Sequence, residues 1–142
     1  MLPQQIVETM YANDAFSQWL GIEIVAVGAG TAVLRMTIRP DMTNGFGIAH
    51  GGISYSLADS ALAFASNSHG RMAVSIETSI SHTAALKVGD VVVARAELEH
   101  LSHKIGLYRV AVVRETSGDL VAAFKGTVYR KEKEWATPAP AC

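Results

Sequence analysis

The feature that most constrains this chain is a helical stretch at residues 51–68 with a single charged side chain, Asp59. On a wheel with about 100° per residue, one narrow arc of this stretch holds Ile53, Leu57, Ala61 and Phe64. The opposite arc holds Tyr55, Asp59, Leu62 and Ser66, and it has no Lys, Glu or Arg. A helix so poor in charge is usually buried nearly all round. We therefore expect a sheet on one side and a partner subunit on the other.

Composition limits the classes of protein that are possible. The 142 residues are 49% hydrophobic and carry a net charge of −1, which fits one domain with a sizeable core and no basic surplus for binding nucleic acid. The single cysteine is Cys142, so neither an intrachain disulfide nor a cysteine-based metal site is expected. Without a signal-peptide pattern or a membrane-length apolar run, we expect a soluble, cytoplasmic protein with no membrane partner.

The remaining patterns predict an α+β fold with a mainly antiparallel sheet. Residues 3–20 have helical spacing, and Asp14 is expected to cap a second short helix within this range. Residues 22–27 and 31–38 form a hairpin around Gly28-Ala29-Gly30. Four further strands are expected at residues 73–83, 90–101, 104–115 and 120–130. One domain over residues 1–130 is followed by a charged and then Ala/Pro-rich segment, 131–142, which we expect to be a flexible tail.

The loop before the central helix is rich in glycine. Its match to a dinucleotide-binding fingerprint is weak, because His50 replaces the last glycine and only one crossover helix follows. Glycines at a helix start leave backbone N–H groups free at the positive end of the helix dipole, which suits an anion or an oxyanion. Asn44 and His50 add donors for a carbonyl oxygen.

Asp59 has two interpretations: a carboxylate bonded to water or to a hydroxyl such as that of Ser60, or a functional group. Its position is nine residues after His50, about 13 Å along a helix, so one carbonyl group of a ligand cannot touch both side chains. A two-fold dimer with antiparallel central helices would bring His50 of one subunit near Asp59 of the other.

The specific pattern is Asn44-Gly45-x-Gly47-x-x-His50-Gly51-Gly52, followed seven residues later by Asp59. It resembles the signature of the phenylacetate-pathway (PaaI-type) hotdog thioesterases, and the resemblance extends over about residues 12–130. The segments that add to it are Asn13-Asp14-Ala15-Phe16, Leu20-Gly21-Ile22 and Lys104-x-Gly106-x-Tyr108. After the third strand the family often has Arg-Pro, whereas this chain has His82-Thr83-Ala84-Ala85.

The resemblance implies a hotdog fold, in which a curved antiparallel sheet wraps a long central helix, and dimers that commonly pair into tetramers. It also implies hydrolysis of an acyl-CoA to free acid and CoA, with phenylacetyl-CoA, its hydroxylated forms or another aryl or medium-chain acyl-CoA as the substrate. Asp59 would be the general base or nucleophile, the Gly51 N–H would bind the oxyanion, and His50 and Asn44 would orient the thioester. Further substrate contacts are expected from Phe16, Gly52, Tyr55, Ser75 and Lys104.

Two other functions are compatible with such a fold. A hotdog dehydratase or isomerase usually shows a different Asp/Asn/His pattern, and a non-catalytic acyl-CoA-binding module would not need Asp59. We expect no cofactor and no metal, because His100 and His103 have ligand-like spacing without a third ligand nearby. A serine-hydrolase elbow, Gly-x-Ser-x-Gly, does not occur in the sequence.

Overall fold

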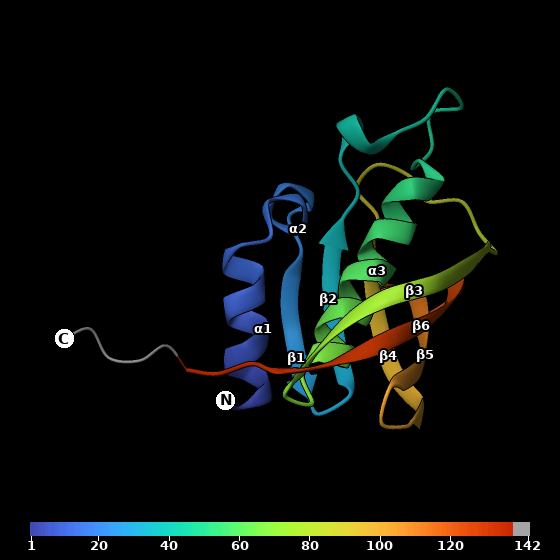
Figure 1. Ribbon diagram of the computed structural model, residues 1–142. Helices are drawn as coiled ribbons and strands as arrows, with labels where there is room; N and C mark the ends of the chain where they lie inside the picture. Colours follow the sequence, from blue (N-terminus) through green and yellow to red (C-terminus); the bar gives the residue numbers. More distant parts are fainter. Residues whose placement is uncertain (138–142) are drawn as a thin grey trace.

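A computed structural model describes residues 1–137 of the chain (Figure 1). The helices are α1 Pro3–Ala12, α2 Ala15–Leu20, the short 3-10 helix η1 Pro40–Met42 and α3 Gly51–Asn67. The strands are β1 Glu23–Gly28, β2 Thr31–Thr37, β3 Arg71–His82, β4 Val91–Leu101, β5 Ile105–Arg114 and β6 Leu120–Glu134. This order confirms the expected succession of helices and strands. No helix within residues 1–137 is long and apolar enough to cross a membrane.

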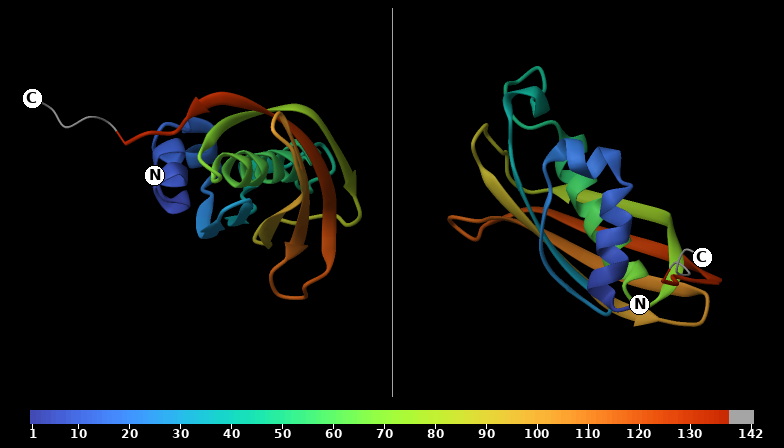
Figure 2. Two further views of the ribbon diagram at one scale, coloured as in Figure 1. Left: turned by 60° about the horizontal axis from the view of Figure 1, so that its bottom comes forward. Right: turned by 90° about the vertical axis from the view of Figure 1, so that its left-hand side faces the viewer.

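The strands form one six-stranded sheet in the order β1-β2-β4-β5-β6-β3, and every neighbouring pair is antiparallel. The sheet curls around α3, as the left view of Figure 2 shows. Because the sheet is open, β1 and β3 are its two edge strands. The pair α1 and α2 lies on the side of α3 that the sheet leaves uncovered (Figure 2).

Local signals explain the N-terminal helices. The carboxylate of Asp14 accepts the Ser17 N–H at 2.9 Å, which caps α2 as expected. Gly21 ends α2 with a φ of 72°, a left-handed conformation that favours glycine. The helices are then held to the core through Ile6 and Val7, which are fully buried, and through the Tyr11 hydroxyl, which donates to the Ile22 carbonyl at 2.7 Å.

The central helix is buried on most of its surface, but its uncovered face differs from the one expected. Leu62 and Ser66, placed opposite the sheet by the helical wheel, are 1% and 2% exposed. The sheet reaches this side too, since Leu62 packs against Gly126 of β6. The least covered stripe is Gly52, Ser56, Asp59 and Ala63. Any partner of α3 therefore meets this narrower stripe of small residues and one carboxylate.

The last strand is longer than expected, since β6 continues to Glu134 and the predicted domain end at residue 130 falls inside it. Arg71 of β3 pairs with Glu134 in the sheet. Beyond the strand, the Trp135 indole donates to the Asn67 side-chain oxygen at 2.9 Å and its backbone N–H donates to the Gly70 carbonyl at 2.7 Å. The first residues of the predicted tail thus belong to the fold, whereas residues 138–142 lie outside the described chain.

Gly126 of β6 lets the sheet approach α3 closely. A Cβ atom at this position would overlap the Leu62 Cδ2 atom and lie 3.0 Å from Leu62 Cδ1. Leu62 is 1% exposed and borders a cavity beside α3, so a Cβ atom at residue 126 would push its side chain out of its packing against β6. The close contact therefore favours glycine in the middle of a strand.

We expect Gly126→Ala to lower the free energy of unfolding by about 1–3 kcal/mol, the usual result of overpacking a core. Alanine loses less conformational entropy than glycine when the chain folds, but the resulting stabilisation of about 0.5–1 kcal/mol is smaller than the expected cost of overpacking. Urea unfolding measures the change, with Gly45→Ala as the control because nothing lies within 4 Å of a Cβ there. Equal midpoints for the two variants would contradict the close contact.

Candidate active site

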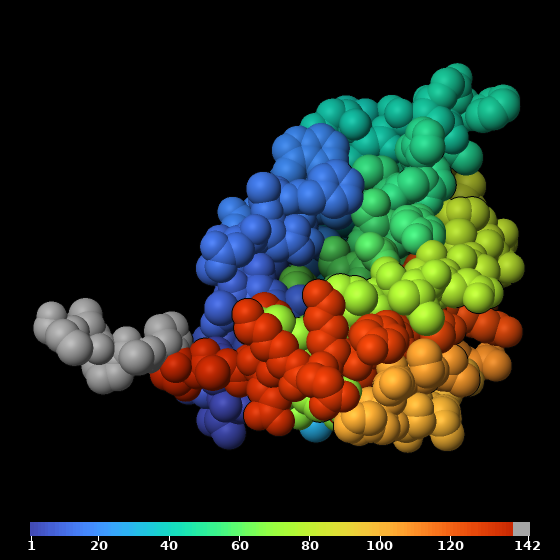
Figure 3. All heavy atoms as spheres, in the orientation of Figure 1, coloured from blue at the N-terminus to red at the C-terminus, as the bar shows by residue number. Residues whose placement is uncertain are grey.

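The uncovered stripe of α3 lies at the surface between the N-terminal helices and β3 (Figure 3). Two cavities open along this stripe. One, of about 260 Å³, contains Asp59 and Ser75, and the other, of about 380 Å³, contains His50 and Gly52. The candidate site therefore consists of two separate parts within one chain.

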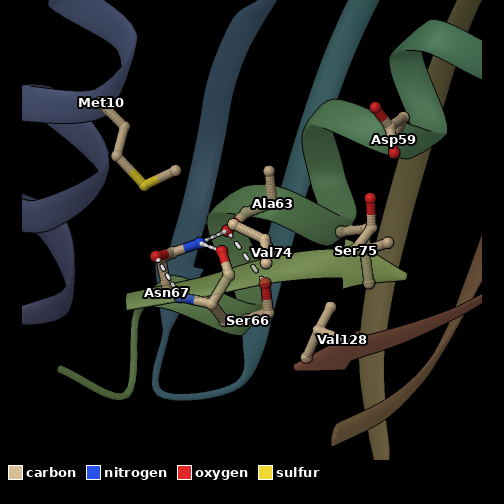
Figure 4. A pocket seen from close by; sticks show the side chains of 10 residues that line it. Met10, Asp59, Ala63, Ser66, Asn67, Val74, Ser75 and Val128 are labelled. Carbon is tan, nitrogen blue, oxygen red and sulfur yellow. Dashed lines mark hydrogen bonds between the residues drawn. The ribbon is translucent and has the colours of Figure 1, made fainter. Parts of the chain in front are cut away.

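Asp59 lies in the third turn of α3 and faces the first cavity (Figure 4). Burial raises the pKa of its carboxyl group above the ordinary value, and the nearby Asp14 carboxylate raises it further. Within residues 1–137, no hydrogen bond or cation offsets this effect. Ser75 of β3 shares the cavity, and Figure 4 shows its hydroxyl on the side of the strand toward Asp59.

Ser60 does not serve as the partner of its neighbour Asp59. The Ser60 hydroxyl lies 2.8 Å from the Ser17 hydroxyl, and Ser17 in turn donates to the Asp14 carboxylate at 2.5 Å. This buried chain of hydrogen bonds fixes α2 against α3 and brings the Asp14 carboxylate close enough to affect Asp59. The simple interpretation of Asp59 as a carboxylate held by Ser60 is therefore not supported.

The start of α3 presents hydrogen-bond donors. His50 is the N-cap residue, and its Nδ1 atom accepts the Gly52 N–H at 2.9 Å. A neutral imidazole whose Nδ1 accepts a hydrogen bond carries its proton on Nε2, so this atom can donate to a ligand. The Gly51 N–H is used by no hydrogen bond within residues 1–137, as is usual in a first helical turn. Both groups suit a carbonyl oxygen that gains negative charge.

A close neighbour, and not the backbone angles, favours glycine at residue 51. Its φ is not positive, whereas a Cβ atom there would lie 3.2 Å from Nε2 of His82. His82 ends β3, and its Nδ1 atom lies 3.3 Å from the Ser54 hydroxyl. The segment in which this chain departs from the family pattern thus packs against the candidate oxyanion donor.

The structure brings Phe16 and Gly52 into the cavity of His50, and Ser75 into the cavity of Asp59. The other expected site residues, Gly51, Asn44, Tyr55 and Lys104, line neither cavity. Gly51 lies between His50 and Gly52 in the chain, next to the second cavity. The Asn44 side-chain oxygen accepts the Phe46 N–H at 2.9 Å and shapes the loop. The Tyr55 hydroxyl forms a hydrogen bond of 2.5 Å with the Thr78 hydroxyl, which links α3 to β3. Lys104 is exposed in the β4–β5 turn.

Sequence reasoning missed Met10, Ser56 and Asn67, which also line the cavities. Ser56 could have been found, because it precedes Asp59 by three residues and so shares its helix face. Met10 looked like an ordinary core residue of an amphipathic helix. Nothing in its local pattern indicates that α1 packs beside the far end of α3.

The chain was also compared with known proteins. Residues 46–121, more than half of the chain, match the family model described as the thioesterase superfamily. The Escherichia coli acyl-coenzyme A thioesterase PaaI is 37% identical over 89% of each chain. The structure of E. coli PaaI, a protein from the phenylacetic acid degradation operon, superimposes with a TM-score of 0.90 over 93% of this chain and 95% of that one, at 36% identity.

A second similar structure is a mutant of the phenylacetic acid degradation protein PaaI from Thermus thermophilus. It is 42% identical, has a TM-score of 0.80, and is matched over 83% of this chain and all of that one. The similarity in sequence and in structure confirms the hotdog fold and the enzyme class that the glycine-rich motif and Asp59 predicted. The chain therefore belongs to the thioesterase superfamily, in its PaaI-type branch of acyl-CoA thioesterases.

Proposed function

We propose that this protein hydrolyses the thioester of an aryl or medium-chain acyl-CoA, with Asp59 as its catalytic carboxylate. The observation that carries the proposal is the position of Asp59, a carboxylate without a compensating partner at one end of a largely apolar cavity. An uncompensated charge in such a place is typical of a catalytic group. A cytoplasmic role in degrading aryl acids is part of the proposal, supported by the operon of the E. coli relative.

Asp59 must be ionised to act. As a general base it accepts a proton from the water that attacks the thioester carbon, and as a nucleophile it attacks that carbon itself and forms an anhydride that water then cleaves. In both cases the carbon–sulfur bond breaks and CoA leaves as a thiolate. The raised pKa makes the carboxylate a stronger acceptor of protons than an exposed aspartate.

The stabilisation of the negative charge that develops on the carbonyl oxygen is assigned to the start of α3. The Gly51 N–H and the Nε2–H of His50 are the proposed donors, and the positive end of the helix dipole adds to their effect. Asn44 is proposed to orient the thioester through its side-chain NH₂ group, since its oxygen is used in the loop. Phe16 lies in the same cavity as His50 and is assigned to substrate contact.

The complete site is proposed to need two subunits. His50 and Asp59 line different cavities of one chain, and β3 is an edge strand with Val74 and Ile76 exposed at 45% and 59%. An unpaired edge with apolar side chains favours pairing with another strand. A second copy related by a two-fold axis would cover this edge and the small-residue stripe of α3. Pairing of two such dimers into a tetramer is the further expectation from the family.

Asp59→Asn should lower kcat by at least about 100-fold, because the acceptor of the proton is lost. Binding of the acyl-CoA should change much less. Thiol release from a panel of aryl and straight-chain acyl-CoAs measures turnover, and calorimetry measures binding. Asp119→Asn, in the exposed β5–β6 turn, is the control and should keep full activity. Near-native kcat in Asp59→Asn would contradict the mechanism.

The acidic limb of the kcat/KM profile should report the raised pKa of Asp59. Activity rises with pH as the carboxyl loses its proton, so the limb lies above the ordinary aspartate value of 3.8. Asp14→Asn removes a negative charge, lowers the pKa of Asp59 and moves the limb to lower pH. Asparagine can still cap α2. If the acidic limb lies at the same pH in the wild type and in Asp14→Asn, the titrating group is not the carboxyl of Asp59 beside Asp14.

Mixing His50→Ala with Asp59→Ala should restore activity. Mixed dimers hold one intact and one doubly damaged site, so random exchange at equal amounts gives about a quarter of the wild-type rate. The separately measured rates of the two variants are the baseline. If subunit exchange is verified with differently tagged copies and the rate stays at the baseline, the shared site is wrong.

A further inference from the structure

The cavity that contains Asp59 extends along α3 toward the C-terminal end of that helix. Asp59, Ala63 and Asn67 line it at four-residue spacing, which places them on one face of the helix. The eight residues from Asp59 to Asn67 correspond to about 12 Å along the helix axis. The cavity is therefore elongated, with the catalytic carboxylate at one end and Asn67 at the other (Figure 4).

The walls between the two ends combine five apolar residues with two hydroxyls. The apolar residues are Leu62, Ala63, Ala73, Val74 and Val128, and the hydroxyls are those of Ser66 and Ser75. At the far end, the Asn67 NH₂ group donates to the carbonyl oxygens of Ala63 and Ala73 at 2.9 and 3.1 Å. Its oxygen accepts from the Ala73 N–H at 3.0 Å and from the Trp135 indole at 2.9 Å. Since all four hydrogen-bonding positions of this amide are used, it offers a ligand no free donor or acceptor.

Met10 reaches this end of the cavity from α1, on the opposite side from β3 (Figure 4). The helix that carries it is fixed to the core by Ile6 and Val7, both fully buried, and by the neighbouring Tyr11, whose ring packs edge-on against Phe64 at 6.4 Å. The methionine side chain itself is unbranched and adapts readily to the shape of a neighbour. An adjustable apolar group on a fixed helix thus borders the end of the cavity.

We propose that the acyl group of the substrate lies along α3 from Asp59 toward Asn67, and that Met10 determines how long an acyl chain is accepted. This inference rests on the proposed function. An apolar tail suits a cavity whose only ionisable lining group is Asp59 and whose far-end amide, Asn67, has all its hydrogen-bonding positions used. Met10 lies outside residues 46–121, which match the family model. Chain-length selection is therefore assigned to the N-terminal helix, and catalysis to α3.

The test compares chain-length profiles. Thiol release gives kcat/KM for saturated straight-chain acyl-CoAs from acetyl to palmitoyl with the wild type, Met10→Ala and Met10→Phe. Met10→Ala should favour longer chains and Met10→Phe shorter ones, each changing the long-to-short ratio by at least about tenfold, the effect of one methylene in an apolar pocket. Glu8→Ala is the control, since Glu8 is exposed on the same helix; its profile should match the wild type.

Profiles with one common optimum in all four proteins would overturn the assignment of Met10. An equal loss for every chain length in the Met10 variants would do so as well, because a purely structural effect does not discriminate between substrates. Calorimetry on Asp59→Asn, with and without each Met10 substitution, measures the same selectivity as Kd without turnover. Absence of thiol release from the wild type would refute the hydrolase function, whereas the shift in Kd tests Met10 independently.

Discussion

The structure depends on the burial of a long helix that has almost no charge. Leu57, Ala58 and Ala61 of α3 have no exposed surface, and the curled sheet packs against them. Burial of apolar surface is the main favourable contribution to folding, and here it comes mostly from one helix and one sheet. Close packing then requires small residues at the contact, of which Gly126 against Leu62 is the tightest example. The absence of a side chain at this position lets β6 lie close to α3.

The same helix also carries the proposed catalytic carboxylate, and the lack of other charge on the helix explains the unusual surroundings of Asp59. A carboxylate on an otherwise apolar helix has few polar neighbours, so burial raises the pKa of Asp59. The hydrogen-bonded chain from Asp14 through Ser17 to Ser60 fixes α2 nearby and adds a second negative charge. The packing of the core and the proton affinity of the proposed base are therefore consequences of one arrangement.

The fold was largely predictable because its signals are local. The Asp14 cap, the left-handed Gly21 and the alternation in β2 each involve residues within a few positions of one another. The end of β6 was predicted wrongly because the charge run at residues 130–134 resembles a solvated tail, whereas Trp135 is held by Asn67, which lies 68 positions earlier. A contact at that separation leaves no trace in a local pattern.

Prediction of the site was less complete for a related reason. A helical wheel gives the angle of each side chain on α3, but the packing of α1, α2 and β3 decides which angles stay open. Tyr55 is close to His50 in the sequence, but its hydroxyl bonds to Thr78 of β3 and its side chain does not line the cavity of His50. The sequence pointed to Asp59 because a carboxylate is unusual on a buried helix, and to His50 because it precedes the glycines at the helix start. Met10 has ordinary core chemistry, and only the tertiary structure places it beside the cavity.

The raised pKa of Asp59 also links catalysis to stability. A carboxyl group whose pKa is higher in the folded state binds its proton more tightly there than in the unfolded chain. Its contribution to stability is complete below the ordinary value of 3.8 and is lost as the pH rises through the raised value. At neutral pH the ionised Asp59 therefore destabilises the protomer, while its greater proton affinity makes it the better base. The same proton affinity that suits Asp59 to the proposed role of base is therefore what weakens the protomer at neutral pH.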